Sequence, residues 1–223
     1  MGRPSTVQVR RFGLVPYEPM FHFMQSWSAE RTTETSDEFW LVEHPPVYTF
    51  GRNAKPEHLL NPGDIPVVNV DRGGQVTYHG PGQLVLYLML DVRRGGWGVR
   101  QLVTSMESAI VTLLSGYGLQ AYADRQAPGV YIDRRKIAAL GLRVKSGRSY
   151  HGLSLNLDMD LAPFLGINPC GYQGLEVIRL ADQVEYQRET LERRLVELLA
   201  QALGFEHMTW LPPLELEDLT CQK

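Results

Sequence analysis

The feature that most constrains the fold is a succession of short apolar segments with few helical patterns between them. Segments of this length, bounded by Gly, Pro and Asp, are typical of strands. Leu153, Leu155 and Leu157 alternate with polar residues, which predicts a strand with only one buried face. The other expected strands cover Phe39–Glu43, Val47–Phe50, Pro66–Val70, a deeply buried Leu84–Asp91, and a Gly129–Ile132/Lys136–Val144 hairpin turned at Asp133–Arg135.

Three helices are expected among these strands. The first covers Pro19–Arg31, the second carries Leu102, Met106, Ile110 and Leu113, and the third carries Leu191, Leu195, Leu198 and Ala202. Because strands come in runs and helices are few, the order is that of an α+β protein around a mixed or antiparallel sheet. No repeat or linker divides the chain, so we expect one domain over residues 1–210 and an extended tail at 211–223.

Composition narrows the function classes. The chain has 223 residues, 43% of them hydrophobic, and a net charge of -3, which argues against a nucleic-acid binder that depends on phosphate contacts. Cys170 and Cys221 are the only cysteines, so there is no disulfide framework and no CxxC metal pattern. The longest apolar run, Leu84–Leu90, is too short to span a bilayer. We therefore expect a cytoplasmic protein without a membrane partner.

Cys170 is the residue most suited to take part in a chemical reaction. It lies between Pro169 and Gly171, which predicts a sharp turn. Structural cysteines are usually buried in regular elements, whereas a thiol on a turn is free to act as a nucleophile toward acyl groups. The local sequence leaves a second interpretation open, in which Cys170 is a small buried hydrophobe that precedes a glycine.

The glycine-rich segment Arg72–Gln83 is the second unusual feature. Four glycines and a proline let its backbone approach a ligand closely, and free N–H groups in such a loop bind carbonyl or phosphate oxygens. A glycine-rich hairpin with satisfied side chains remains the alternative. The phosphate-loop pattern GxxxxGK[ST] is absent. A GxGxxA string at Gly116–Ala121 follows a helix, where a dinucleotide fingerprint follows a strand, and we discount it.

Four blocks in the right order resemble the lipoyl(octanoyl) transferase family, the octanoyltransferases of lipoate synthesis. They are Arg72–Tyr87, Arg134–Val144, His151–Asp158 and Asn168–Val177, and Glu43–Arg52 is similar to the family's N-terminal block. The resemblance runs from Phe12 to Leu203. It implies an α/β fold of the biotin and lipoate protein ligase type, a single domain with a mixed sheet flanked by helices. It also implies a monomer that uses no cofactor.

The resemblance implies transfer of an octanoyl group from the thioester of acyl carrier protein to a lysine of a lipoyl domain. Such acceptors are the E2 subunits of 2-oxoacid dehydrogenases and the glycine cleavage H protein, and the transfer is the first committed step of endogenous lipoylation. Cys170 would carry the octanoyl group as a thioester, and Lys136 would be its acid–base partner. An ammonium about 4 Å from the sulfur, at a dielectric near 20, is worth roughly 4 kcal/mol, enough to favour thiolate. Without the resemblance, the sequence favours the interpretation that Lys136 is a solvated lysine of the hairpin.

The remaining residues of the matching blocks would bind the acyl substrate. His79 and His151 are expected to be hydrogen-bonded pocket residues rather than bases. The backbone amides at Ala139–Gly141 and Gly152–Ser154 would stabilise the oxyanion. Burying seven apolar carbons contributes about 5 to 6 kcal/mol, which favours a tunnel that measures chain length. The substrate-binding residues implied are Arg72, Gly73, Gly74, Gln75, Val76, Thr77, Tyr78, His79, Ala139, Leu140, Gly141, Gly152, Leu153 and Ser154.

Other functions give different expectations. The six histidines show no HxxxH pairing, so no metal site is expected. An ATP-dependent lipoate or biotin ligase shares the expected fold but has no use for Cys170. A non-catalytic protein that binds acyl carrier protein or lipoyl domains would never become acylated. Because acyl carrier proteins are acidic, we expect a local basic rim, with candidates Arg134, Arg135, Arg143, Lys145 and Arg148.

Overall fold

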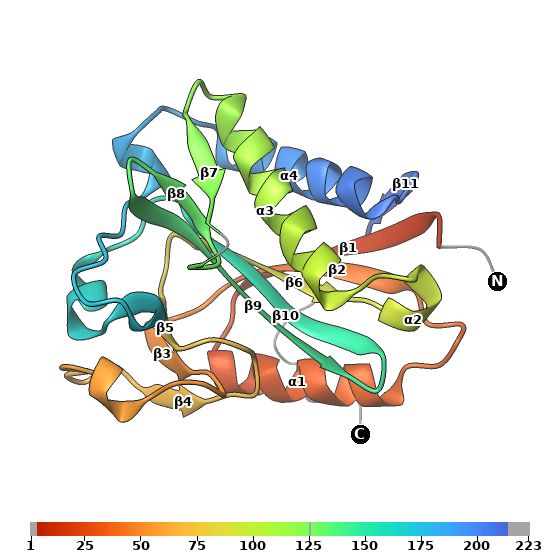
Figure 1. Cartoon of the computed structure of the whole chain (residues 1–223). Helices are drawn as coiled ribbons and strands as arrows, with labels where there is room; N and C mark the ends of the chain where they lie inside the picture. Colours follow the sequence, from red (N-terminus) through yellow and green to blue (C-terminus); the bar gives the residue numbers. More distant parts are fainter. Residues whose placement is uncertain (1–3, 125, 214–223) are drawn as a thin grey trace.

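An eight-stranded mixed sheet forms the centre of the molecule, with helices on both of its faces (Figure 1). This computed structural model describes residues 4–124 and 126–213. Pairing is parallel between the first three strands in spatial order and antiparallel between the others. The spatial order is β11 (His207–Trp210), β1 (Thr6–Leu14), β2 (Asp37–Glu43), β6 (Gln83–Met89), β10 (Arg148–Asn156), β9 (Arg135–Lys145), β8 (Val130–Ile132) and β7 (Ala121–Ala123).

A smaller three-stranded sheet lies beside one end of the main sheet, at the lower left of Figure 1. Its order is β4 (Val67–Asn69), β3 (Val47–Phe50) and β5 (Val76–His79). Strand β5 is part of the glycine-rich segment, so this small sheet fixes that segment against the main sheet. Four single-turn helices complete the loops: η1 (Pro56–His58), η2 (Ala162–Gly166), η3 (Pro169–Gly171) and η4 (Leu180–Asp182).

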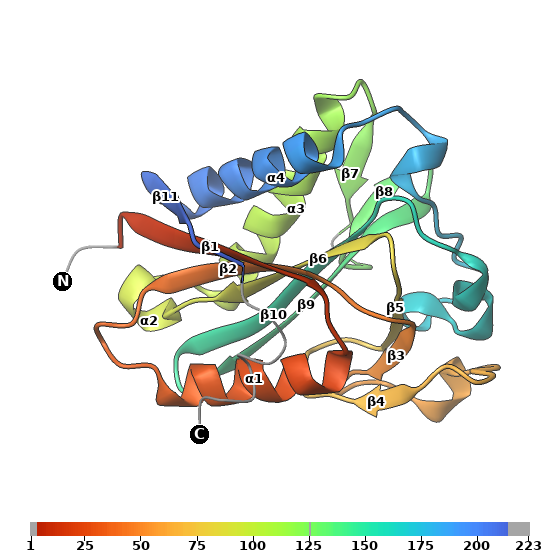
Figure 2. The ribbon, with the colours of Figure 1, turned by 180° about the vertical axis from the view of Figure 1, so that it is seen from behind.

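The helices divide the core into two layers. Helices α3 (Val99–Ser115) and α4 (Arg188–Leu203) cover one face of the main sheet, and α1 (Tyr17–Glu30) crosses the other face, as Figure 2 shows from behind. The short α2 (Val92–Gly95) follows β6. The larger apolar cluster lies under α3 and α4, and a second, rich in aromatic residues, lies under α1. None of the helices in the described residues has both the length and the apolar character to cross a membrane.

The mixed sheet and the three long helices confirm the sequence prediction, with boundaries shifted by a few residues. Strand β10 is a correction: Ser154 and Asn156 are as buried as the leucines between them, because α1 and the small sheet cover its second face. Ala202 is exposed, and Leu199 is buried instead. Strands β1, β5, β7 and β11 were not expected. Cys221 and residues 214–223 of the expected tail lie outside the described residues.

The β8–β9 hairpin fixes the position of Lys136. Ile132 pairs with Arg135, so the connection is a two-residue turn formed by Asp133 and Arg134. Both turn residues have positive φ, 48° and 66°, as a type I′ turn requires. The turn therefore puts Lys136 at the start of β9 in a fixed register, and its backbone also bonds to Glu176 and Ile178 of a neighbouring segment.

Candidate active site

Cys170 and Lys136 are brought together although 34 positions separate them in the sequence. Lys136 Nζ lies 2.7 Å from Cys170 Sγ. Cys170 is partly exposed on η3, whereas Lys136 is 3% exposed. A partly exposed thiol beside a buried ammonium is the environment in which a cysteine reacts as thiolate. The two side chains therefore lie within hydrogen-bonding distance of one another.

The turn that carries Cys170 is unusual for a residue with a side chain. Cys170 has φ 57° and ψ 14°, in the left-handed region, and Gly171 follows with φ 80°. A left-handed residue other than glycine costs about 1 to 2 kcal/mol and persists only where its surroundings impose it. Here Asn168 N–H bonds to His58 O at 2.9 Å, and Gly171 N–H bonds to Asn168 O at 2.9 Å. The loop thus holds the sulfur in one place.

The ammonium of Lys136 is held by the protein on more than one side. Besides the sulfur, Nζ donates to the carbonyl oxygen of Pro128 at 2.9 Å, and it lies 5.4 Å from the ring centroid of Tyr131. Among the described residues, 4–124 and 126–213, no ion pair involves Lys136. Of the two groups that accept hydrogen bonds from Nζ, the sulfur is the one that can carry a negative charge.

A cavity of about 510 Å³, including its open mouth, extends from Cys170 between the small sheet and strands β9 and β10. All the predicted substrate-binding residues except Gly73 and Tyr78 line it, together with Cys170. Lys136 is not among the lining residues and contacts the site through Cys170. Three further lining residues were missed by the sequence analysis: Tyr17, Val85 and Tyr87. His151, which was expected as a pocket residue, lines the cavity as well.

The two exceptions have structural explanations. Side chains alternate along β5, and Tyr78 points away from the cavity to pack against Tyr48 and Phe164. Gly73 N–H donates to Leu142 O at 3.1 Å, which fastens the glycine-rich segment to β9. Gly73 therefore supports the cavity wall from behind.

Arg72 brings a buried positive charge to the cavity wall. Its guanidinium donates to Thr49 O at 2.8 Å and to Gly73 O at 2.9 Å, and it is 8% exposed. Burial lowers the pKa of Arg72, and the neighbouring Tyr17 and Cys170 oppose that shift. Its hydrogen-bond partners are oxygens without net charge, so the charge is left for a ligand. Thr49, its main partner, carried no signal in the sequence.

Neutral histidines and tyrosines lie at the cavity under α1: Tyr17, His79 and Tyr87 line it, and His44 contacts it through Tyr87. His44 Nδ1 lies 2.6 Å from Val15 O, and its Nε2 lies 2.7 Å from the Tyr87 hydroxyl. His79 Nδ1 lies 2.7 Å from Gln83 Oε1. Burial lowers the pKa of His44 to about 4 and that of His79 to about 3. Both imidazoles are therefore neutral near pH 7, and both are hydrogen-bonded, as was expected for His79.

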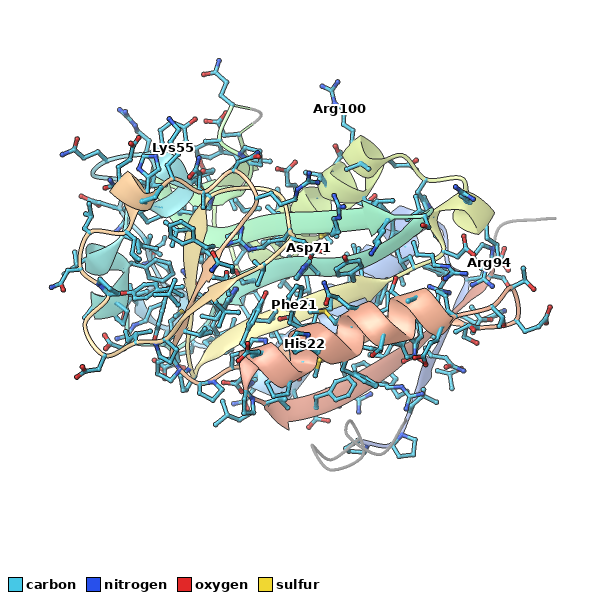
Figure 3. All side chains as sticks on the ribbon, turned by 90° about the horizontal axis from the view of Figure 1, so that it is seen from below. Phe21, His22, Lys55, Asp71, Arg94 and Arg100 are labelled. Carbon is cyan, nitrogen blue, oxygen red and sulfur yellow. The ribbon has the colours of Figure 1, made fainter. Side chains whose placement is uncertain are left out.

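Asp71 and His151 form a second hydrogen-bonded pair. His151 Nε2 lies 3.1 Å from Asp71 Oδ1, and Tyr150 donates to the other carboxylate oxygen. Burial raises the pKa of Asp71, but the bonds from His151 and Tyr150 outweigh it and bring it to about 2. Phe21 of α1 stacks on His151 with ring centroids 5.5 Å apart. Figure 3 shows Asp71 and Phe21 where α1 crosses below the main sheet.

The backbone offers fewer oxyanion donors than the sequence suggested. Gly152, Leu153 and Ser154 lie in β10, which pairs with β6 on one side and β9 on the other, so its amides belong to the sheet. The β8–β9 ladder ends at Ala138. Leu142 O accepts from Gly73 at this open edge, and residues two apart share a direction, so the Leu140 amide points to the same edge. Leu140 is thus the strongest backbone candidate.

Two further sequence predictions concern a metal site and a basic rim. Among the described residues, no group of three or more His, Cys, Asp and Glu is placed to hold a metal ion.

The five basic-rim candidates do not form one rim. Arg148 donates to Ser28 O and Ala29 O of α1, and Arg143 lies 3.9 Å from Asp71, while Arg134 and Arg135 lie at the opposite end of the β9–β10 hairpin. Arg134 and Arg135 share a surface groove with Tyr172, two residues from Cys170.

Comparison with known proteins identifies the family of this chain. Residues 17–200 match the model of the lipoyl protein ligase A/B catalytic domain. An octanoyltransferase of Shewanella oneidensis is 52% identical over 206 residues, which cover 92% of this chain and 94% of the relative. A bi-partite lipoate protein ligase of Thermoplasma acidophilum has a TM-score of 0.74 at 14% identity, covering 97% of this chain and 90% of that chain.

A biotin protein ligase of Aquifex aeolicus has a TM-score of 0.52 at 8% identity, covering 88% of this chain and 68% of that chain. Likenesses at such low identity speak to the fold alone, and they confirm the predicted ligase-type architecture. The family model and the high identity over nearly the whole length of a curated relative go further. On these grounds the chain belongs to the lipoyl(octanoyl) transferase family.

Proposed function

We propose that this protein transfers an octanoyl group from acyl carrier protein to a lysine of a lipoyl domain, and that Cys170 carries the group between them. Membership of the octanoyltransferase family supports the reaction. The 2.7 Å contact between Lys136 Nζ and Cys170 Sγ, at the wall of an acyl-sized cavity, is the observation that carries the mechanism.

In the first half-reaction the Cys170 thiolate attacks the carbonyl carbon of the donor thioester. The carbonyl oxygen becomes an oxyanion, for which the Leu140 amide is the proposed donor. The intermediate collapses by breaking the bond to the carrier sulfur, and the Lys136 ammonium gives that sulfur its proton. The products are free carrier thiol, octanoyl-Cys170 and a neutral Lys136. Exchange of one thioester for another is nearly balanced in energy, so the step needs no ATP.

In the second half-reaction the amine of the target lysine attacks octanoyl-Cys170. Neutral Lys136 accepts the proton that the amine loses, and the intermediate collapses by releasing the Cys170 thiolate. This restores the original ammonium–thiolate pair. An amide replaces a thioester, which drives the transfer forward. Because the carrier leaves before the acceptor reacts, one site serves both proteins in turn.

The acyl chain is proposed to occupy the cavity. Val76 and Val85 supply apolar surface, and the glycines at 74, 141 and 152 let the walls approach one another. Burial of seven apolar carbons contributes about 5 to 6 kcal/mol. The buried Arg72 guanidinium is proposed to lie beside the reacting end, where negative charge develops on the oxyanion.

Transfer assays separate this proposal from a ligase. Purified protein is mixed with octanoyl-acyl carrier protein and a lipoyl domain, with no nucleotide present, and octanoylation of the lipoyl domain is followed by mass. We expect complete transfer by the natural protein and none by Cys170→Ala. Transfer that requires ATP and free octanoate, and that survives in Cys170→Ala, would mean a ligase. Binding without any transfer would mean a recognition module.

A further inference from the structure

His151 lies at the end of the cavity opposite Cys170. It pairs with Leu142, six residues along β9 from Lys136, which corresponds to about 20 Å at the strand rise of about 3.3 Å per residue. His151 and Cys170 both line the cavity, and Lys136 contacts the Cys170 sulfur. An acyl chain that is attached to Cys170 and extends along the cavity therefore points its last carbons toward His151.

The imidazole of His151 is fixed from several sides. Its Nε2 lies 3.1 Å from Asp71 Oδ1, and Phe21 of α1 stacks on the ring with centroids 5.5 Å apart (Asp71 and Phe21 are labelled in Figure 3). His151 has φ 61° although it lies within β10, a conformation that side chains rarely adopt and that persists only where the surroundings impose it. The ring is therefore held in one orientation at the cavity.

One ring nitrogen of His151 is left for a ligand. An ionised carboxylate accepts hydrogen bonds and donates none, so Nε2 carries the hydrogen that bonds to Asp71. Burial lowers the pKa of His151, so the ring is neutral near pH 7 and its Nδ1 is an acceptor. Nδ1 is buried and has no hydrogen-bond partner among the described residues. A buried acceptor without a partner is costly, so this end of the cavity favours a ligand that brings a donor.

We propose that His151 Nδ1 accepts a hydrogen bond from a hydroxyl group at the distal end of an acyl chain, so that the protein transfers ω-hydroxyacyl groups as well as octanoyl groups. This inference rests on the proposed function, because the transfer itself is the same. Cys170 attacks the carbonyl carbon of the ω-hydroxyacyl thioester, and the carrier sulfur leaves with a proton. The lysine amine of the acceptor then replaces the Cys170 sulfur. The distal hydroxyl forms and breaks no covalent bond.

The hydrogen bond can be isolated by comparing two chains of equal length. A nonanoyl group and an ω-hydroxyoctanoyl group differ only in that a hydroxyl replaces the terminal methyl. In a wholly apolar tunnel the hydroxyl loses its hydrogen bonds to water and gains none, so nonanoyl is favoured. At His151 the hydroxyl gains a bond, whereas nonanoyl leaves Nδ1 without a partner. The ratio of the two transfer rates therefore reports the contact.

The test is a competition between the two chains. The protein is mixed with ω-hydroxyoctanoyl- and nonanoyl-acyl carrier protein in equal amounts, and the mass of the modified lipoyl-domain peptide gives the product ratio. We expect the natural protein to transfer ω-hydroxyoctanoyl at least as fast as nonanoyl. It should transfer ω-methoxyoctanoyl, which keeps the oxygen but cannot donate, about tenfold more slowly than ω-hydroxyoctanoyl.

The variant His151→Phe keeps an aromatic ring beside Phe21 and removes the acceptor. Its ratio of ω-hydroxyoctanoyl to nonanoyl product should be about tenfold lower than that of the natural protein. Because each ratio is taken within one protein, a general loss of activity cancels. His22→Phe, the same change at an exposed position of α1, is the matched control and should keep the natural ratio (Figure 3).

Two results overturn the inference. One is an unchanged product ratio in folded His151→Phe. The other is a tenfold preference of the natural protein for nonanoyl, which decides the matter even where His151→Phe fails to fold. Failure of the proposed function has a different signature, because the natural protein then transfers no octanoyl group from acyl carrier protein. Failure of the His151 inference leaves octanoyl transfer intact.

Discussion

The two faces of the main sheet, divided by strand β10, are built on different principles. On one face Leu155 packs under α3 and α4 within the largest apolar cluster. On the other face Ser154 lines the cavity and Asn156 bonds to Gln83. Both faces are buried, since each of these residues is at most 4% exposed. One face removes apolar surface from water, and the other encloses polar groups.

The difference shows where stability and reactivity are located. Apolar burial under α3 and α4 is favourable in proportion to its area. The cavity face contains His44, His79, Arg72 and Lys136, groups whose burial is costly unless each finds a partner. Hydrogen bonds satisfy most of them, and the remaining charges converge on the cavity. The comparison predicts that substitutions on the two faces separate into effects on folding and effects on transfer.

The largest expected effect comes from the ammonium beside the nucleophile. Lys136→Met should lower the single-turnover rate of octanoyl transfer by about 10²- to 10⁴-fold, because it removes both the thiolate's partner and the acid–base group. Lys145→Met, an exposed lysine of the same strand, is the control and should transfer at the natural rate. A parent-like rate in Lys136→Met would contradict the comparison.

The apolar face should respond in the opposite way. Leu155→Ala removes a fully buried side chain and should cost about 2 to 5 kcal/mol in the free energy of unfolding, measured in urea. Transfer per folded molecule should be unchanged. Leu14→Ala, at an exposed position, should shift the free energy by less than about 0.5 kcal/mol. Loss of transfer in folded Leu155→Ala would show that the two faces are not independent.

Acid should weaken the cavity face selectively. The pKa of His44 is about 4 in the folded protein, below its ordinary value of 6.5, so the unfolded chain binds more protons between these values. The stability that neutral His44 contributes is therefore complete above pH 6.5 and is lost as the pH falls toward 4.

His44→Gln can keep the bonds to Val15 and Tyr87 but does not titrate. Between pH 7 and pH 4.5, both proteins should lose free energy of unfolding. The loss in His44→Gln should be smaller than that in the natural protein, and the difference should be on the order of 2 kcal/mol. Chemical denaturation at both pH values measures the difference. Identical losses in the two proteins would mean that His44 does not titrate across this range.

The smallest effect is expected at the surface. Arg134 and Arg135 lie in the groove next to Tyr172, close to Cys170. At the far end of the hairpin, Arg143 lies 3.9 Å from Asp71 and Arg148 donates to carbonyl oxygens of α1. Arg134→Ala should raise KM for octanoyl-acyl carrier protein about two- to threefold at low salt and less at high salt. Lys145→Ala should not. An effect that is independent of salt would remove charge as its cause.

Much of the first face could be predicted from the sequence. The leucines of α3 and α4 repeat at helical spacing, and Leu153 and Leu155 alternate at strand spacing, so periodicity reports burial there. The same alternation misled at Ser154 and Asn156, because polar residues signal exposure unless a second layer covers them. Strand β1 was missed for a related reason: Gln8, Arg10 and Arg11 interrupt its apolar residues.

The cavity face was accessible mainly through resemblance. No local pattern connects Cys170 with Lys136, because a contact between residues 34 positions apart depends on the hairpin turn and on the loop that carries the thiol. Thr49 and Tyr17 gave no signal, since ordinary residues become partners of Arg72 and the cavity only after folding.

The central claim is that Cys170 carries the octanoyl group, and intact-mass analysis of the protein tests it most directly. The protein is mixed with octanoyl-acyl carrier protein without ATP, beside Cys170→Ala. We predict the mass gain of one octanoyl group in the natural protein only, labile to hydroxylamine and cleared by adding a lipoyl domain. No adduct in either protein, with lipoyl domains octanoylated all the same, would contradict the covalent mechanism and leave Cys170 without a catalytic role.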